Sequence, residues 1–167
     1  MQVLIEGIKQ FCVKQQKDTK FDVAKLKANL SLLPSGYELK KIDSELYDKC
    51  FENPETVDFV SAFGTKEKYL ELGRGVALKD GKIVAGASSY TRYKNGIEIE
   101  VDTLESERRN HLATVCCSAL ILNCLEEGLY PSWDAHNMNS VHLAQKLGYE
   151  FSHEYVAYEV SVEKRTH

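Results

Sequence analysis

The sequence lacks the features that would place the chain in a membrane or on a nucleic acid. No apolar run approaches the roughly 18 consecutive residues that a membrane-spanning helix needs. The first twenty residues carry Glu6 and have neither the apolar core nor the small-residue cleavage site of a secretory signal. The formal net charge is −4, and acidic residues are interleaved with the lysines between Lys9 and Lys27, so no basic stripe for nucleic acid is present. We therefore expect a cytoplasmic protein that binds neither membranes nor nucleic acids.

The cysteines lack the spacing of a metal site. There are five, an odd number, with no CxxC pair and no paired Cys/His spacing, so no metal is predicted. Cys116, Cys117 and Cys124 lie in one apolar run, and we expect buried reduced thiols there, because free cysteine packs as a small hydrophobe. A catalytic thiol would need an activating neighbour such as histidine, and the sequence places none.

The chain of 167 residues fits one main domain with a small extension. We expect residues 1–34 to be an N-terminal helical extension and residues 35–167 to form the domain. Helices are predicted over 2–16 and 22–32, the second capped by Asp22 or Thr19. The Leu-Pro-Ser-Gly segment at 33–36 is the clearest boundary, since proline and glycine together stop a helix.

The segment from residue 37 onward mixes strand and helix patterns. We expect a strand at 37–42, then helical pieces over 44–72 with breaks near Asn53 and Gly64. Asp80-Gly81 and Asn95-Gly96 are strong hairpin signals, so residues 73–103 should form an antiparallel three-stranded meander. A buried helix over 112–129, a strand at 131–136, a helix at 138–148 and one or two strands at 149–162 follow. The predicted class is α+β.

The octamer ERRNHLAT, residues 107–114, stands where the buried helix should begin. A helix start offers about four unpaired N–H groups and the positive end of the helix dipole, which together bind anions. Arg108 and Arg109 add charge-assisted donors for a phosphate. Taken alone, the octamer is more typical of a solvated helix start than of a phosphate site.

The sequence around this octamer resembles the acyl-CoA-binding core of the GNAT N-acetyltransferases. In that superfamily a strand leads into a loop of pattern Gln/Arg-x-x-Gly-x-Gly/Ala, which opens the central helix and holds the CoA pyrophosphate. Arg108, His111 and Ala113 match as Arg-x-x-His-x-Ala, with His111 in the place of a glycine. Glycine permits a positive φ, so His111 must adopt another conformation or narrow the loop, while Asn110 tolerates the left-handed region well.

A second match lies downstream, in WDAHNMNSVHLAQKLGY at 133–149. Superfamily members carry an asparagine at the end of the next strand, here Asn137, and a helix that ends in Lys-Leu-Gly-aromatic. The run from Glu98 to Tyr149 resembles the branch called GNAT acetyltransferases, which includes zwittermicin-resistance-like proteins. By itself this segment would be an amphipathic helix with an asparagine cap and a glycine stop.

The resemblance implies the GNAT fold, a mixed and mostly antiparallel sheet flanked by helices, with acetyl-CoA as acyl donor. Two neighbouring parallel strands should splay, leaving main-chain groups free for the pantetheine amides. A main-chain N–H near Val101 would stabilise the charge that develops on the thioester carbonyl. The donor contacts so implied are Val101, Thr103, Arg108, Arg109, Asn110, His111, Leu112, Ala113, Thr114, Asn137 and Ser140.

Candidate catalytic residues follow from the strand before the loop and from the second motif. Alternation puts Glu98, Glu100 and Asp102 on one face of the strand, and we favour Glu100 as the base that takes a proton from the amine. An exposed acidic face is the alternative. Many superfamily members use a tyrosine as general acid where this chain has Ala144, so Tyr149 is the nearest candidate, with core packing as its alternative. Asn137 is expected near the reacting amine.

Further expectations concern the acceptor site and the function. Trp133 should pack in the core, and His136 is a candidate substrate contact or base. The predicted activity is transfer of an acetyl group from acetyl-CoA to a primary amine of a small molecule, by direct attack in a ternary complex. The rival functions are a non-catalytic acyl-CoA-binding module and a scaffold that keeps the fold. A homodimer is expected by the same resemblance.

Overall fold

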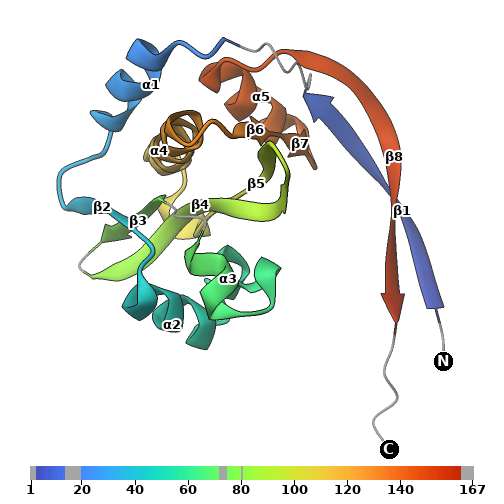
Figure 1. Ribbon diagram of the computed structural model, residues 1–167, viewed down its shortest axis with the longest axis horizontal. Coiled ribbons are helices and arrows are strands. Elements are labelled where there is room, and N and C mark those ends of the chain that lie inside the picture. The colour runs from blue at the N-terminus through green and yellow to red at the C-terminus, as the bar shows by residue number, and fades with distance from the viewer. Residues whose placement is uncertain (1–2, 14–19, 72–74, 80, 163–167) are drawn as a thin grey trace, which may run out of the picture.

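The computed structural model describes residues 3–13, 20–71, 75–79 and 81–162, which form two sheets and the helices around them (Figure 1). In chain order the elements are β1 (Val3–Val13), α1 (Val23–Leu30), β2 (Tyr37–Lys41), α2 (Ser44–Glu52), η1 (Val57–Phe59), η2 (Ser61–Phe63), α3 (Lys66–Leu70), β3 (Gly75–Lys79), β4 (Lys82–Tyr93), β5 (Gly96–Thr103), η3 (Glu105–Glu107), α4 (Leu112–Glu126), β6 (Tyr130–Ser132), β7 (Asp134–Ala135), α5 (Met138–Leu147) and β8 (Phe151–Val162). The predicted α+β class is confirmed.

The larger sheet has the order β2-β3-β4-β5-β6, and only its last pair, β5 and β6, is parallel. Helices α1 and α4 cover one face, while α2, α3 and the short η1 and η2 turns cover the other (Figure 1). The meander predicted over 73–103 is present as β3, β4 and β5. Residues 73, 74 and 80 of that segment lie outside the described residues.

The smaller sheet has the order β7-β1-β8, and its two long strands form a ribbon that runs away from the body (Figure 1). The helix predicted over 2–16 is therefore wrong where the chain is described, because residues 3–13 are β1. Eleven residues of β1 are registered antiparallel to β8, from Val3 opposite Val162 to Val13 opposite Phe151. Pairing with a strand about 150 residues away decided the conformation of this segment, which sequence periodicity cannot reveal. The division between residues 1–34 and 35–167 stays a prediction.

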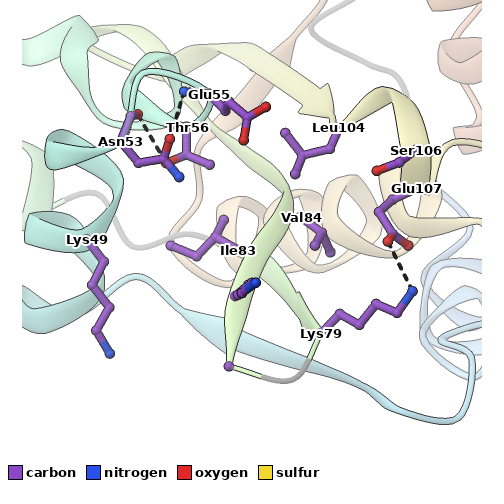
Figure 2. A pocket seen from close by; sticks show the side chains of 12 residues that line it. Lys49, Asn53, Glu55, Thr56, Lys79, Ile83, Val84, Leu104, Ser106 and Glu107 are labelled. Carbon is purple, nitrogen blue, oxygen red and sulfur yellow. Dashed lines mark hydrogen bonds and ion pairs between the residues drawn. The ribbon is translucent and has the colours of Figure 1, made fainter.

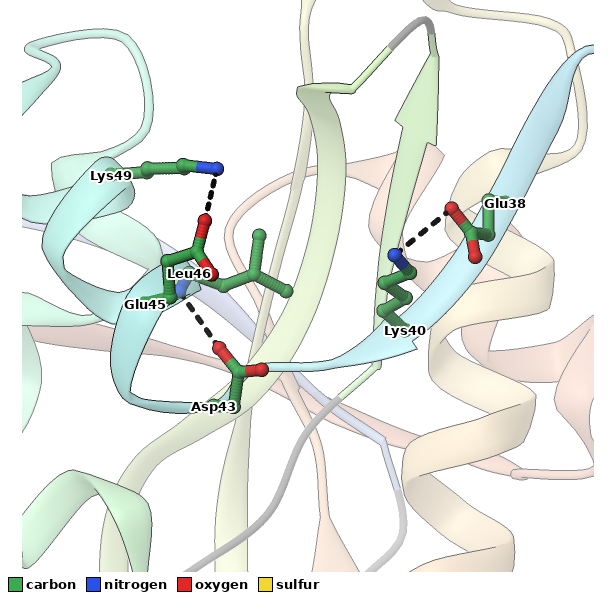
Figure 3. A network of polar contacts seen from close by, with 6 residues as sticks. All are labelled: Glu38, Lys40, Asp43, Glu45, Leu46 and Lys49. Carbon is green, nitrogen blue, oxygen red and sulfur yellow. Dashed lines mark hydrogen bonds and ion pairs between the residues drawn. The ribbon is translucent and has the colours of Figure 1, made fainter.

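Aspartate side chains cap the starts of α1 and α2, and Asp22 is one of the two caps that the sequence offers for α1. The Asp22 carboxylate accepts from the main-chain N–H of Lys25 and begins α1, so Asp22 is the cap. Asp43 does the same for α2 through the N–H of Leu46 at 2.9 Å, and Lys49 pairs with Glu45 one turn away in that helix (Figure 3). These contacts fix the residue at which each helix begins.

Helix α4 is the centre of the main core, because it is apolar on nearly every side. Cys116, Cys117 and Cys124 are buried residues of this helix, and Cys50 is a buried residue of α2, as expected for structural thiols. Burial alone raises the pKa of the Cys50 thiol to about 12. Cys12 lies in β1, and its side chain is outside the described part of the structure.

The strand predicted at 131–136 is two strands that belong to different sheets. Ser132 ends β6 opposite Glu98 of β5, whereas Asp134 and Ala135 form β7 opposite β1. Trp133 stands between them and is buried, with 2% of its surface exposed. The chain therefore leaves the larger sheet at Trp133, which determines the shape of the site described below.

Among the described residues no helix is long and apolar enough to span a membrane.

Gly96 opens β5 opposite Tyr130, and a side chain there would collide with the Tyr130 carbonyl oxygen and with the Tyr93 ring. Gly96→Ala should destabilise the protein by about 1–3 kcal/mol, because the Tyr130 carbonyl is a main-chain group of the β5–β6 pair and cannot move aside freely. At Gly86 an added Cβ would lie 3.2 Å from the Phe59 ring, a milder contact, so Gly86→Ala should cost less. Urea unfolding of both variants checks this order, and equal losses would contradict it.

Candidate active site

Strands β5 and β6 part after Glu98. Their parallel register covers only Gly96 to Glu98, so from Ile99 onward β5 has a strand partner, β4, on one side only among the described residues. The main-chain N–H of Leu104 donates to Val84 in β4. Because main-chain groups alternate in direction along a strand, those of Ile99 and Val101 point away from β4, into the gap that β6 leaves.

From Ile99 to Thr103, β5 thus has a free edge on the side that β6 leaves. The last residue of this free edge, Thr103, already has local hydrogen-bond partners. Its N–H donates to the Asp102 carboxylate at 2.7 Å, and its carbonyl accepts a long contact of 3.4 Å from Arg108 Nε. Its hydroxyl Oγ1 is buried without a hydrogen-bond partner. A buried hydroxyl without a partner is costly, so this atom is available to a ligand at the end of the edge.

A cavity of about 410 Å³ lies where the free edge meets the start of α4. His111 is the N-cap of α4 and makes no side-chain capping bond, so the N–H groups of the first helical turn have no capping partner. Cationic groups of the loop and of α5 surround them. The cavity is lined by Thr103, Glu107, Arg108, Arg109, His111, Leu112, Ala113, Thr114, Leu143 and Lys146.

The loop before α4 contains two residues other than glycine with positive φ. His111 has a φ of 61° and Arg109 a φ of 69°. His111 thus keeps the left-handed conformation that a glycine would take, at a cost of roughly 1–2 kcal/mol for each such residue. Asn110, which the sequence favours for that conformation, is not in it. Its side chain instead donates to the Tyr37 hydroxyl, and Asn110 does not line the cavity.

A second cavity, of about 280 Å³, lies at the point where β5 and β6 part. No lysine or arginine is among the described residues that line it. They are Tyr90, Glu98, Ile99, Glu100, Val101, Trp133, Asp134, His136 and Ser140. We call it the acidic cavity, after Glu98, Glu100 and Asp134. Val101 joins the acidic cavity to the free edge of β5, which leads to the cavity at the start of α4.

Glu98 is the most perturbed carboxyl group of the acidic cavity. Burial and, to a lesser degree, the Asp134 carboxylate raise its pKa to about 7, against an opposing hydrogen bond from the Asp134 main chain. Glu98 Oε1 and Asp134 Oδ1 are buried without hydrogen-bond partners, while Asp134 Oδ2 accepts from the Tyr155 hydroxyl at 2.8 Å. Sequence reasoning placed Glu98 on the right face but did not single it out, because its closeness to Asp134 depends on how β6 ends.

Glu100, the base favoured from the sequence, lines the same cavity. Burial, followed by the charges of Asp102 and Asp58, raises its pKa. The predicted alternation is confirmed, since Ile97, Ile99 and Val101 pack into the core around α4. Glu98 and Glu100 both line the acidic cavity.

The residues of the second motif, at 133–149, have different structural roles. Asn137 is the N-cap of α5, and its side-chain oxygen accepts from the N–H of Ser140. The Ser140 hydroxyl accepts from Trp133 Nε1 at 3.1 Å and reaches the acidic cavity. His136 is exposed and lines that cavity as well. Trp133 is a core residue, as expected.

Tyr149 requires a correction. It is 3% exposed, its hydroxyl donates to the Pro131 carbonyl at 2.7 Å, and burial raises its pKa well above the ordinary value. It lines neither cavity. Core packing, the alternative given for it, describes its place better than the role of general acid.

A larger cavity of about 650 Å³ lies between α2, the β3–β4 turn and η3 (Figure 2). Among the described residues, Glu107 alone lines both this cavity and the cavity at the start of α4. Its carboxylate pairs with Lys79 at 3.0 Å (Figure 2).

Comparison with known proteins places this arrangement in a family. The family described as GNAT acetyltransferase matches residues 2–158. The chain belongs to that family. The predicted GNAT fold is thereby confirmed, and the match includes the segment that forms β1.

Three relatives show how far the likeness extends. An uncharacterized N-acetyltransferase, YdfB, of Bacillus subtilis (strain 168) is 33% identical over 134 residues, which are 75% of this chain and 49% of that protein. The crystal structure of a GCN5-related N-acetyltransferase-like protein from Streptococcus suis 89/1591 is 44% identical with a TM-score of 0.87, over 94% of this chain and 63% of that one. The chain thus spans about half to two thirds of the length of these relatives.

The third relative shares the fold alone. The aminoglycoside N-acetyltransferase AAC(6')-Iy, solved with the bisubstrate analog CoA-S-monomethyl-acetylneamine, is 19% identical with a TM-score of 0.53. The match covers 79% of this chain and all of that one.

The left-handed conformation of His111 predicts how substitutions there will behave. His111→Gly should raise the free energy of unfolding by up to about 1 kcal/mol, because relief of the φ strain exceeds the entropy cost of glycine. His111→Val should lower it, since a β-branched residue tolerates positive φ worst. Thermal unfolding of both variants tests this. If the glycine variant were the less stable of the two, His111 would not have this conformation in solution.

Proposed function

We propose that the protein transfers an acetyl group from acetyl-CoA to a primary amine of a small molecule, by direct attack within a ternary complex. The observation that carries this proposal is the free edge of β5, with a cavity lined by Arg108, Arg109 and Lys146 at one end and the acidic cavity at the other. Acetyl-CoA is a phosphate-bearing thioester, and the amine is a cation before it reacts. Each end of the edge suits one of these two substrates.

The residues along the free edge and at the start of α4 have the chemistry needed to bind acetyl-CoA. The N–H groups at the start of α4 and the Arg108 and Arg109 side chains would bind the pyrophosphate. The main-chain groups of Ile99 and Val101 would pair with the pantetheine amides as an added strand would. The Val101 N–H would also polarise the thioester carbonyl, which supplies the acetyl group. Thr103, Asn110 and Asn137 have other partners in this structure, so their direct contacts to the donor stay predictions.

The acidic cavity would bind the amine and take its proton. An alkyl amine with a pKa near 10.4 is about one part in a thousand neutral at pH 7.4, so a base must remove its proton before attack. Glu98 has a pKa of about 7, which matches a base that works near neutral pH. We propose Glu98 for this step, with Glu100 in the same cavity as the alternative. The departing thiol has an ordinary pKa near 8.5 and can leave without a dedicated acid.

The acceptor, the location and the assembly are parts of the same proposal. The acidic lining favours a cationic amine over a neutral or anionic one, and the fold is shared with an enzyme whose analog joins CoA to an aminoglycoside fragment. A cytoplasmic location and a homodimer stay predictions.

Glu98→Gln should lower kcat/KM about a hundredfold or more and also make the protein more stable at pH 8. Glu98 keeps its proton in the folded state up to about pH 7, whereas an ordinary glutamate loses it near pH 4.5. The wild-type protein therefore loses stability as pH rises from about 4.5 to about 7, by roughly 3 kcal/mol. The glutamine variant should not show this loss.

The measurements are the pH profile of kcat/KM, which should rise through an ionisation near 7 in the wild type, and urea unfolding at pH 5 and pH 8. Glu100→Gln is the matched variant. If Glu100→Gln removed that ionisation and Glu98→Gln left it, Glu100 would be the base.

Arg108→Ala should weaken binding of CoA about tenfold, because a charge-assisted hydrogen bond to a phosphate is lost. Calorimetric titration of the purified protein with CoA and acetyl-CoA measures this. Lys82→Met, at the β3–β4 turn, removes a positive charge that does not line the cavity at the start of α4 and serves as a control. Tight CoA binding without turnover on any amine would favour the non-catalytic binding module, and no CoA binding at all would favour the scaffold.

A further inference from the structure

The loop that opens α4 holds two strained residues without the glycine that would relieve them, so other contacts must hold its shape. Strained backbone persists only where the surrounding structure fixes it. Arg109 and His111, the two residues with positive φ, flank Asn110. Contacts at Asn110 therefore control both.

One hydroxyl joins the two ends of this loop. The Tyr37 side chain, at the start of β2, donates its hydroxyl hydrogen to Glu107 Oε2 at 2.5 Å and accepts from Asn110 Nδ2 at 3.2 Å. Lys79, at the end of β3, donates to Glu107 Oε1 at 3.0 Å and lies over the Tyr37 ring at 5.3 Å from its centre. The Glu107 side chain is 12% exposed and that of Lys79 43% exposed.

We propose that Tyr37 and Lys79 are positioning residues for donor binding, acting through Glu107 and Asn110. The inference rests on the proposed function, because it assumes that the loop binds the CoA pyrophosphate. Neither Tyr37 nor Lys79 lines the cavity at the start of α4, so neither touches the donor there. They set the conformation of the loop from outside, through contacts that reach it from β2 and β3.

Lys79 has a second effect, on charge. Glu107 lines the cavity at the start of α4, where its carboxylate would repel a phosphate. Hydrogen bonds from Tyr37 and then from Lys79 lower the pKa of Glu107, so it stays ionised at neutral pH. The Lys79 ammonium compensates that negative charge. The loop gains a rigid anchor in Glu107 while the anion site stays positive.

The test compares Tyr37→Phe, Lys79→Met and the double variant Lys79→Met/Glu107→Gln in calorimetric titrations with CoA and in steady-state kinetics. Each single variant should weaken CoA binding about tenfold and raise the KM for acetyl-CoA equally. The KM for the amine should not change. The double variant should bind CoA better than Lys79→Met does, because it lacks the uncompensated carboxylate.

Lys82→Met is the matched control for Lys79→Met. Lys82 pairs with Lys79 across the β3–β4 turn, so the control removes one charge from the same hairpin and should bind CoA as the wild type does. Circular dichroism confirms that each variant is folded.

Two results would overturn the inference alone: wild-type CoA affinity in both single variants, or a double variant no better than Lys79→Met. Failure of the wild-type protein to bind CoA would overturn both the inference and the proposed function.

Discussion

The site depends on one constraint, the departure of the chain from the larger sheet at Trp133. Ser132 pairs with Glu98, but Asp134 pairs with β1 in the other sheet, so the residue between them has to turn inward. The indole is held there by packing against Tyr149 at 5.6 Å between ring centres and by its bond to Ser140. Because β6 stops there, β5 keeps a free edge, and main-chain groups without a partner beside a cavity can bind an extended ligand.

The same departure makes the acidic cavity. Asp134 is drawn beside Glu98 by its place in β7 and is fixed there by Tyr155 of β8. The ribbon of β1 and β8 therefore contributes to the electrostatics of the site although most of it lies away from the body (Figure 1). Placing two carboxylates together with unpaired buried oxygens costs stability. An arrangement of this kind is typical of a functional site, because packing alone gives no reason to retain it.

The sequence predicts features that depend on neighbouring residues, and it does not predict those that depend on residues far apart in the chain. The turn at Asn95-Gly96, the cap at Asp22 and the start of α4 at the octamer follow from chemistry within a few residues. The strand β1 depends on a partner at the other end of the chain, so its periodicity was misleading. Glu98 and Tyr37 were missed for the same reason, because their significance comes from Asp134 and Glu107, which only the fold brings near them. His111 was correctly identified as the unusual residue, but its conformation depends on contacts to Asn110 from β2.

Under the proposed function, a rigid loop before α4 matters more to donor binding than a strongly attractive one. From Glu98 to Thr103 the edge of β5 rises about 3.3 Å per residue, or about 17 Å in all. This strand segment is held by β4 along one side, so the distance between the cavity at the start of α4 and the acidic cavity is fixed. A donor whose phosphates shift along the loop carries its thioester past Val101 and Glu98 by the same amount, and a displacement of about 1 Å can cost a hundredfold in rate. Additional positive charge would strengthen binding without correcting such a shift. Contacts that fix the backbone between Arg109 and His111 would correct it, and these contacts reach the loop from β2 and β3.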